Sequence, residues 1–179
     1  FPPTELTFKH YLNLVQDEKL LQSILLSLYI GLVSTLLAGV VGVCAALGIV
    51  KGRLPFKGML ESFFLGPLIV PLVTTGIGFL IIIVPLGILG SPLSLILAHS
   101  IVISPYIVRI AIANLRYADP ALEEAAIVHG ASVPYAFWTV VFPQMLPSLI
   151  AGSILSFLVS LDEFTVTIFL LRADTVTLP

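Results

Sequence analysis

The sequence predicts an all-α membrane protein, built as a polytopic bundle of transmembrane helices with about four spans. Hydrophobic residues make up 58% of the chain and charged residues only 10%, whereas soluble domains carry about 25% charged residues. The mean hydropathy is +1.13. Three stretches, residues 20–50, 62–108 and 125–161, contain no Asp, Glu, Lys or Arg. One crossing of the hydrocarbon core needs roughly 20 apolar residues, so these stretches hold several spans.

The limits of the charge-free stretches place four helices, near residues 22–50, 61–84, 93–113 and 147–171. The second and third are separated by residues 85–92, which contain two prolines and two glycines, as turns do. Pro67 and Pro71 predict that the second helix is kinked or broken. We expect residues 1–179 to be one transmembrane domain and a fragment of a longer chain.

The first helix carries Ala38, Gly42 and Ala46 at four-residue steps, a spacing that lets helices approach closely in lipid. Such a stripe indicates packing and does not identify a function. Cys44 is the only cysteine, so neither a disulfide framework nor a metal site is predicted. A net charge of −2 without any basic run gives no reason to expect nucleic acid as a partner.

The densest positive cluster, Lys51, Arg53 and Lys57, follows the first helix. Cytoplasmic loops of membrane proteins carry an excess of Lys and Arg, which places residues 51–58 in the cytoplasm. Alternation of the spans then places residues 114–146 in the cytoplasm as well. Residues 1–20 and 85–92 are expected on the external side.

Between the third and fourth spans lies a short segment with signals for its own helix, over residues 120–129. Asp119 is a suitable N-cap and Pro120 suits the first helical position. Glu123 and Glu124 lie near the positive end of the helix dipole. Gly130 fits the position after the helix end. The mostly small, apolar side chains of this predicted helix suit insertion into a groove on a partner. The alternative is a connector that lies on the lipid headgroups.

The motif Glu124-Ala125-Ala126, followed by Gly130, Val140 and Phe142-Pro143, resembles the EAA loop of binding-protein-dependent ABC importer permeases. Val140 and Phe142 depart from the usual Ile and Leu but remain apolar. The resemblance implies a type I ABC importer permease fold. It also implies a coupling loop at residues 114–146, with Glu123, Glu124, Ala125, Ala126 and Gly130 as the residues that couple to an ATPase.

The same resemblance implies the partners. They are two ATP-binding subunits that hold ATP and Mg, a second permease subunit forming a homodimer or heterodimer, and a periplasmic or surface solute-binding protein. The bilayer is expected to be the bacterial inner membrane. The chain contains no G-x-x-x-x-G-K-[ST] motif. We therefore expect no enzymatic activity and no bound cofactor in this subunit.

Asp162 and Glu163 lie about fifteen residues into the predicted fourth helix. A central Asp costs about 2.5–3.5 kcal/mol on insertion scales, and such residues usually face a pathway or a polar partner. The alternatives are a structural polar contact and an unwound helix. The string Ser160-Leu161-Asp162-Glu163-Phe164 resembles spermidine/putrescine permeases. This implies that Asp162, Glu163 and Thr165 line a route for a polyamine or another small cationic solute.

His99, in the third predicted helix, is either a pathway group or a histidine whose hydrogen bonds are satisfied by neighbouring hydroxyls or a carbonyl. Two other function classes stay open at this point. An ion-coupled secondary transporter or channel would use Asp162 as its ion-coupled group, but it gives the segment around Glu124 no role. A passive assembly subunit would not depend on Asp162 at all.

Overall fold

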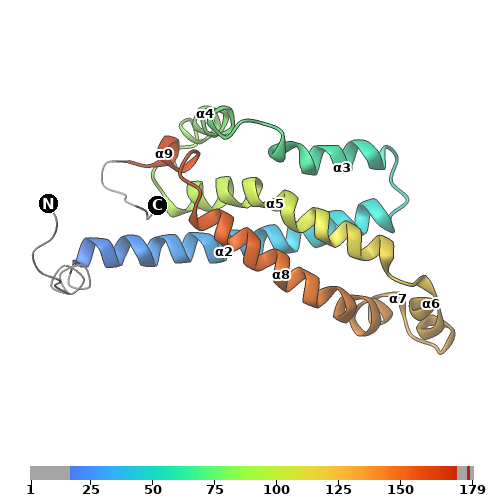
Figure 1. The fold of residues 1–179 in the computed structure, drawn as a ribbon. Helices are drawn as coiled ribbons and strands as arrows, with labels where there is room; N and C mark the ends of the chain where they lie inside the picture. The colour runs from blue at the N-terminus through green and yellow to red at the C-terminus, as the bar shows by residue number, and fades with distance from the viewer. Residues whose placement is uncertain (1–16, 173–176, 178–179) are drawn as a thin grey trace, which may run out of the picture.

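The computed structural model describes residues 17–172 and Thr177, and every regular element within them is a helix (Figure 1). This confirms the predicted all-α class. In chain order the elements are α2 (Glu18–Val50), α3 (Lys57–Leu65), the 3-10 turn η1 (Gly66–Leu68), α4 (Leu72–Ile83), α5 (Pro92–Tyr117), α6 (Pro120–Val128), α7 (Val133–Ala136), the π-helical segment η2 (Phe137–Val141), α8 (Phe142–Leu161) and α9 (Thr167–Leu170). Most of the predicted outer segment 1–20 lies outside the described residues.

Three long helices, α2, α5 and α8, pack together as the core of the bundle. The small residues Ala38, Gly42 and Ala46 of α2 are all buried. A Cβ added at Gly42 would lie 3.1 Å from the side chain of Ile107 on α5. The small-residue stripe therefore brings α2 close to α5, as expected of helix packing in lipid.

Three of the described helices are long and apolar enough to cross a membrane, and a fourth crossing is possible from a bent pair. That pair corresponds to the helix predicted over residues 61–84, and it is broken, as its prolines predicted. The axis turns by 102° between residues 57–68 and 72–83. Pro67 lies in η1 and Pro71 immediately precedes α4, so the break falls where prolines remove backbone donors.

The helix predicted over residues 147–171 is placed differently by the structure. Helix α8 runs from Phe142 to Leu161, continuous with the π-helical segment before it, and Pro147 lies inside it. The prediction began this helix near residue 147, but Pro143 occupies the first turn. The helix ends ten residues earlier than predicted, so Asp162 and Glu163 lie in a break between α8 and α9.

Different short helices lie at the two ends of the bundle (Figure 1). Helices α6 and α7 lie at one end, beyond the C-terminal end of α5, and α9 lies toward the other. Helix α2 runs along the length of the bundle between the two ends. Helix α8 follows α7 and η2 in the chain and precedes α9. These two ends hold the residues that the sequence singled out.

Candidate functional site

Helix α6 is defined at both ends by its own sequence. The Oδ1 of Asp119 accepts a hydrogen bond from the amide of Ala121 at 2.9 Å, and Pro120 occupies the first turn. After the helix, Gly130 adopts a φ of +94° and donates its amide to the carbonyl of Ile127 at 2.9 Å. A positive φ is easily reached by glycine alone. The helix predicted over residues 120–129 is thus present, one residue shorter.

The structure separates two acidic residues that the sequence grouped together. The carboxylate of Glu123 forms an ion pair with the ammonium of Lys51, which follows the last residue of α2. Glu124 is exposed on the outer side of α6, as is Ala125, while Ala126 is partly buried. Among the five residues predicted to couple, Glu124 is therefore the acidic group available to a partner, and Glu123 is held within the chain.

The outer surface around α6 and α7 is apolar. Its large exposed side chains are Leu122, Ile127, Val128, Val133, Tyr135 and Trp138. An open recess of about 610 Å³ lies next to them, lined by Ala126, His129, Gly130, Ala131, Ser132 and Tyr135. No residue of α6 is fully buried within the chain. A short helix with an exposed apolar face is the type of element that docks into a groove.

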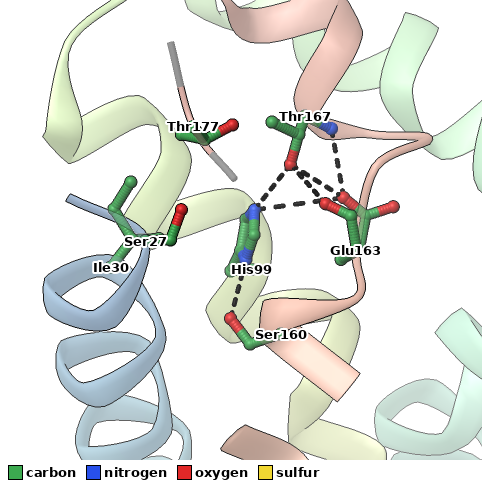
Figure 2. A pocket seen from close by; sticks show the side chains of 7 residues that line it. All are labelled: Ser27, Ile30, His99, Ser160, Glu163, Thr167 and Thr177. Carbon is green, nitrogen blue, oxygen red and sulfur yellow. Dashed lines mark hydrogen bonds and ion pairs between the residues drawn. The ribbon is translucent and has the colours of Figure 1, made fainter. Parts of the chain in front are cut away.

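At the other end, four polar side chains, His99, Ser160, Glu163 and Thr167, form what we call the buried cluster (Figure 2). The Nδ1 of His99 lies 2.7 Å from the Oγ of Ser160, in the last turn of α8. Its Nε2 lies 2.9 Å from the Oγ1 of Thr167, the first residue of α9. One imidazole on α5 therefore joins the two helices on either side of the break.

Glu163 of the buried cluster has its carboxylate fully engaged by nearby groups. Oε1 accepts from the amide of Val166 at 2.8 Å, and Oε2 accepts from the amide of Thr167 at 3.1 Å. The Thr167 hydroxyl donates within 3.0 Å of Oε2, and the His99 Nε2 lies 3.9 Å from the same oxygen. The carboxylate satisfies the amides that begin α9, which otherwise have no helical partner.

The buried cluster borders a small cavity, shared with Ser27 and Ile30 of α2 and with Thr177. Its volume of about 10 Å³ is close to the room that one water molecule needs. An organic solute does not fit there in this conformation. The cluster is therefore a packed polar junction between α2, α5 and the break after α8.

The three predicted pathway residues are thus divided. Asp162 is exposed, Thr165 is partly buried, and Glu163 is 5% exposed and directed into the cluster. For His99, the geometry matches the interpretation of a histidine satisfied by hydroxyls. Its partners are Ser160 and Thr167, which lie 61 and 68 positions away, rather than hydroxyls that neighbour it in the sequence. The sequence showed no link between Thr167 and His99, because this contact spans 68 positions.

Comparison with known proteins gives a consistent set of relatives. The chain is 30% identical over 94% of its length to the putrescine transport system permease protein PotI of Escherichia coli. It is 30% identical over 89% to the spermidine/putrescine permease PotC of Haemophilus influenzae. Over 82% it is 32% identical to the molybdenum transport system permease ModB of Mycobacterium tuberculosis.

The chain spans 63%, 62% and 60% of these three relatives, which is less than two thirds of each. Residues 38–178 match one protein family, and this match includes α5, α6, α8 and the break with Asp162 and Glu163. The match covers well over half of the chain and agrees with the EAA-type spacing around Glu124. The chain belongs to the family of binding-protein-dependent transport system inner membrane components.

Proposed function

We propose that the protein containing this chain is the transmembrane permease subunit of an ATP-driven ABC importer. The observation that carries the proposal is helix α6. It is short, fixed at both ends by Asp119 and Gly130, and exposes Glu124 beside apolar side chains. It connects two long apolar helices, α5 and α8, within a family of transport system membrane components. A helix of this kind needs a partner to cover it.

The partner at this end is proposed to be an ATP-binding subunit that holds ATP and Mg. Two such subunits, a second permease subunit and a solute-binding protein would complete the importer. We propose that residues 51–58 and 114–146 face the cytoplasm and that residues 1–20 and 85–92 face the external side. Arg116, which pairs with Glu61, adds a further cation to the α6 end, in keeping with the positive-inside rule.

The connection between α6 and the membrane suggests how coupling would work. From α6 the chain continues through α7 and the π-helical η2 directly into α8. Helix α8 ends at the break that carries Asp162. Closure of the ATPase subunits on ATP would displace α6, and α8 would transmit this displacement to the break. The pathway would switch in this way between outward and inward access.

The solute is proposed to be a polyamine or another small cation. Two relatives are named for putrescine or spermidine/putrescine and one for molybdenum. The exposed carboxylate of Asp162, next to the partly buried Thr165, would favour an ammonium group over an anion. Glu163 has its oxygens occupied by amides and a hydroxyl. We therefore assign Glu163 to holding the break and Asp162 to facing the solute.

The test is purification of the full-length protein with its native partners, followed by reconstitution into liposomes. The expected result is co-isolation of a P-loop ATPase and ATP-dependent uptake of putrescine, with molybdate and an amino acid as comparison solutes. Ion-driven transport by the chain without an ATPase would contradict the proposal and support a secondary transporter or channel. Preferred uptake of molybdate would support the importer function but contradict the proposal of a cationic solute.

A further inference from the structure

The ion pair between Glu123 and Lys51 joins two elements that are far apart in the sequence. Glu123 lies in the first turn of α6, and Lys51 is the residue that ends α2. Both side chains are partly buried, at 19% and 34% exposed. Helix α6 otherwise packs chiefly against α7 and η2, the elements that follow it in the chain. The pair therefore connects α6 to a different part of the bundle.

The α2 side of this contact is rigid. Leu47 accepts hydrogen bonds from the amides of Lys51 and Gly52, at 2.9 and 3.1 Å. A Cβ at Gly52 would lie 2.3 Å from the carbonyl oxygen of Gly48, so only glycine fits the turn that ends α2. The ammonium of Lys57 donates to the carbonyl of Val50 at 3.1 Å, which fastens the start of α3 to the same end.

Helix α2 also reaches the buried cluster. Its residues Ser27 and Ile30 line the small cavity beside His99 and Glu163 (Figure 2). Ser27 and Lys51 lie about 36 Å apart along the axis, at about 1.5 Å per residue. Between them α2 is one uninterrupted helix, and one of its faces is buried against α5 and α8. One end of α2 thus meets α6, and a part near its other end meets the break.

We propose that the Glu123–Lys51 ion pair is a second coupling connection, through which displacement of α6 moves α2 and so reaches the buried cluster. This inference rests on the proposed importer function. It gives the two adjacent acids separate tasks: Glu124 faces the ATPase, and Glu123 transmits the movement within the permease. Both are required if α2 and α8 are to shift together around the break.

The experiment is a charge exchange in the full-length permease, assembled with its partners in liposomes. Three variants are compared: Lys51→Glu, Glu123→Lys, and the double exchange Lys51→Glu with Glu123→Lys. The measured quantity is putrescine taken up per ATP hydrolysed. Each single variant places like charges together, and we expect the ratio to fall by up to about five-fold, the upper end of the range for exposed ion pairs. The double exchange restores the attraction and is expected to restore the ratio.

The matched control is the second ion pair at the same end, between Arg116 and Glu61, at 2.6 Å. It joins α5 to α3 and does not involve α6. The variant Glu61→Lys, which breaks this pair from the α3 side and outside residues 114–146, is expected to leave uptake per ATP unchanged. A fall as large as that of Lys51→Glu would overturn the proposal, because reversing any charge at this end would then have the same effect.

Two other results would also overturn it. One is an unchanged ratio in Lys51→Glu, and the other is a double exchange that stays as low as Glu123→Lys, which would place Glu123 against the ATPase instead. If reversed charges prevent assembly, Lys51→Gln and Glu123→Gln replace them, and ratios equal to wild type would contradict the proposal. Failure of the proposed function itself is seen separately, as a wild-type complex without ATP-dependent uptake of putrescine or molybdate.

Discussion

The two ends of the bundle differ in the burial of their polar residues. At the α6 end, charged side chains remain at the surface, and none of the α6 residues is fully buried. At the break, His99, Ser160, Glu163 and Thr167 are buried and bonded to one another. The first arrangement leaves a surface for a partner. The second holds an irregular backbone in place, which lipid alone would not tolerate.

The contrast is sharpest between two neighbours in the sequence. Asp162 is exposed and Glu163 is 5% exposed, although both are carboxylates in the same break. Glu163 accepts from two backbone amides and a hydroxyl, whereas Asp162 follows the last turn of α8 and faces outward. Substitution of each should therefore give different defects, in stability for Glu163 and in transport for Asp162.

The largest stability effect is expected for Glu163→Ala. The substitution leaves the amides of Val166 and Thr167 without an acceptor, and hydrogen bonds to a charged group contribute about 1.5–3 kcal/mol each. We expect a loss of about 3 kcal/mol in the free energy of unfolding, measured by denaturant titration in detergent micelles. Glu163→Gln keeps one carbonyl oxygen as acceptor and should lose less. Equal stability of wild type and the alanine variant would show that the cluster does not hold the break.

His99→Ala should follow, with a loss of about 2 kcal/mol in the same titration. The substitution removes the imidazole bonded to the Ser160 hydroxyl, leaves the Thr167 hydroxyl with Glu163 only, and creates a cavity between α5 and the break. His99→Gln, which can still reach one hydroxyl, is the control and should recover part of the loss. If the two variants are equally stable, the imidazole does not connect α8 to α9.

At the α6 end, Gly130→Ala should lose about 1 kcal/mol, because the left-handed conformation at φ +94° is unfavourable for other residues. Nothing lies within 4 Å of the added Cβ, so the effect comes from the backbone and not from a clash. Gly58→Ala in α3 has equally open surroundings without a positive φ and serves as control. Uptake per ATP should fall in Gly130→Ala and not in Gly58→Ala; the reverse would remove Gly130 from coupling.

The smallest stability effect is expected for Asp162→Asn, within about 0.5 kcal/mol, as for most exposed substitutions. Its effect should be on transport instead. Half-saturation of uptake should require a higher putrescine concentration, because the carboxylate that attracts the ammonium group is gone. An unchanged concentration dependence would exclude Asp162 from the solute route and favour a purely structural break.

The sequence predicted one end of the molecule better than the other, for a physical reason. Helix α6 was predicted to within one residue because Asp119, Pro120 and Gly130 act on backbone within a few positions. The end of α8 was misplaced because apolar residues continue past Leu161, and the break depends on Glu163 binding amides. The partners of His99 lie 61 and 68 positions away, beyond the reach of local patterns.

The same limit applies to the acidic pair on α6. Residue type and spacing placed Glu123 and Glu124 on one short helix, but they could not show which one faces inward. Lys51 lies 72 positions from Glu123, and its cluster with Arg53 and Lys57 was a guide only to topology. The structure shows that Glu123 on α6 pairs with Lys51 after α2, a link that the sequence did not reveal.

The central claim is that the two ends have separate tasks, coupling at Glu124 and solute contact at Asp162. One measurement tests it directly: uptake and ATP hydrolysis recorded together over a range of putrescine concentrations, for Glu124→Gln and Asp162→Asn in the reconstituted complex. Glu124→Gln should lower uptake per ATP at every concentration, without shifting half-saturation. Asp162→Asn should shift half-saturation and keep uptake per ATP at saturation. The same change in both variants would contradict the account.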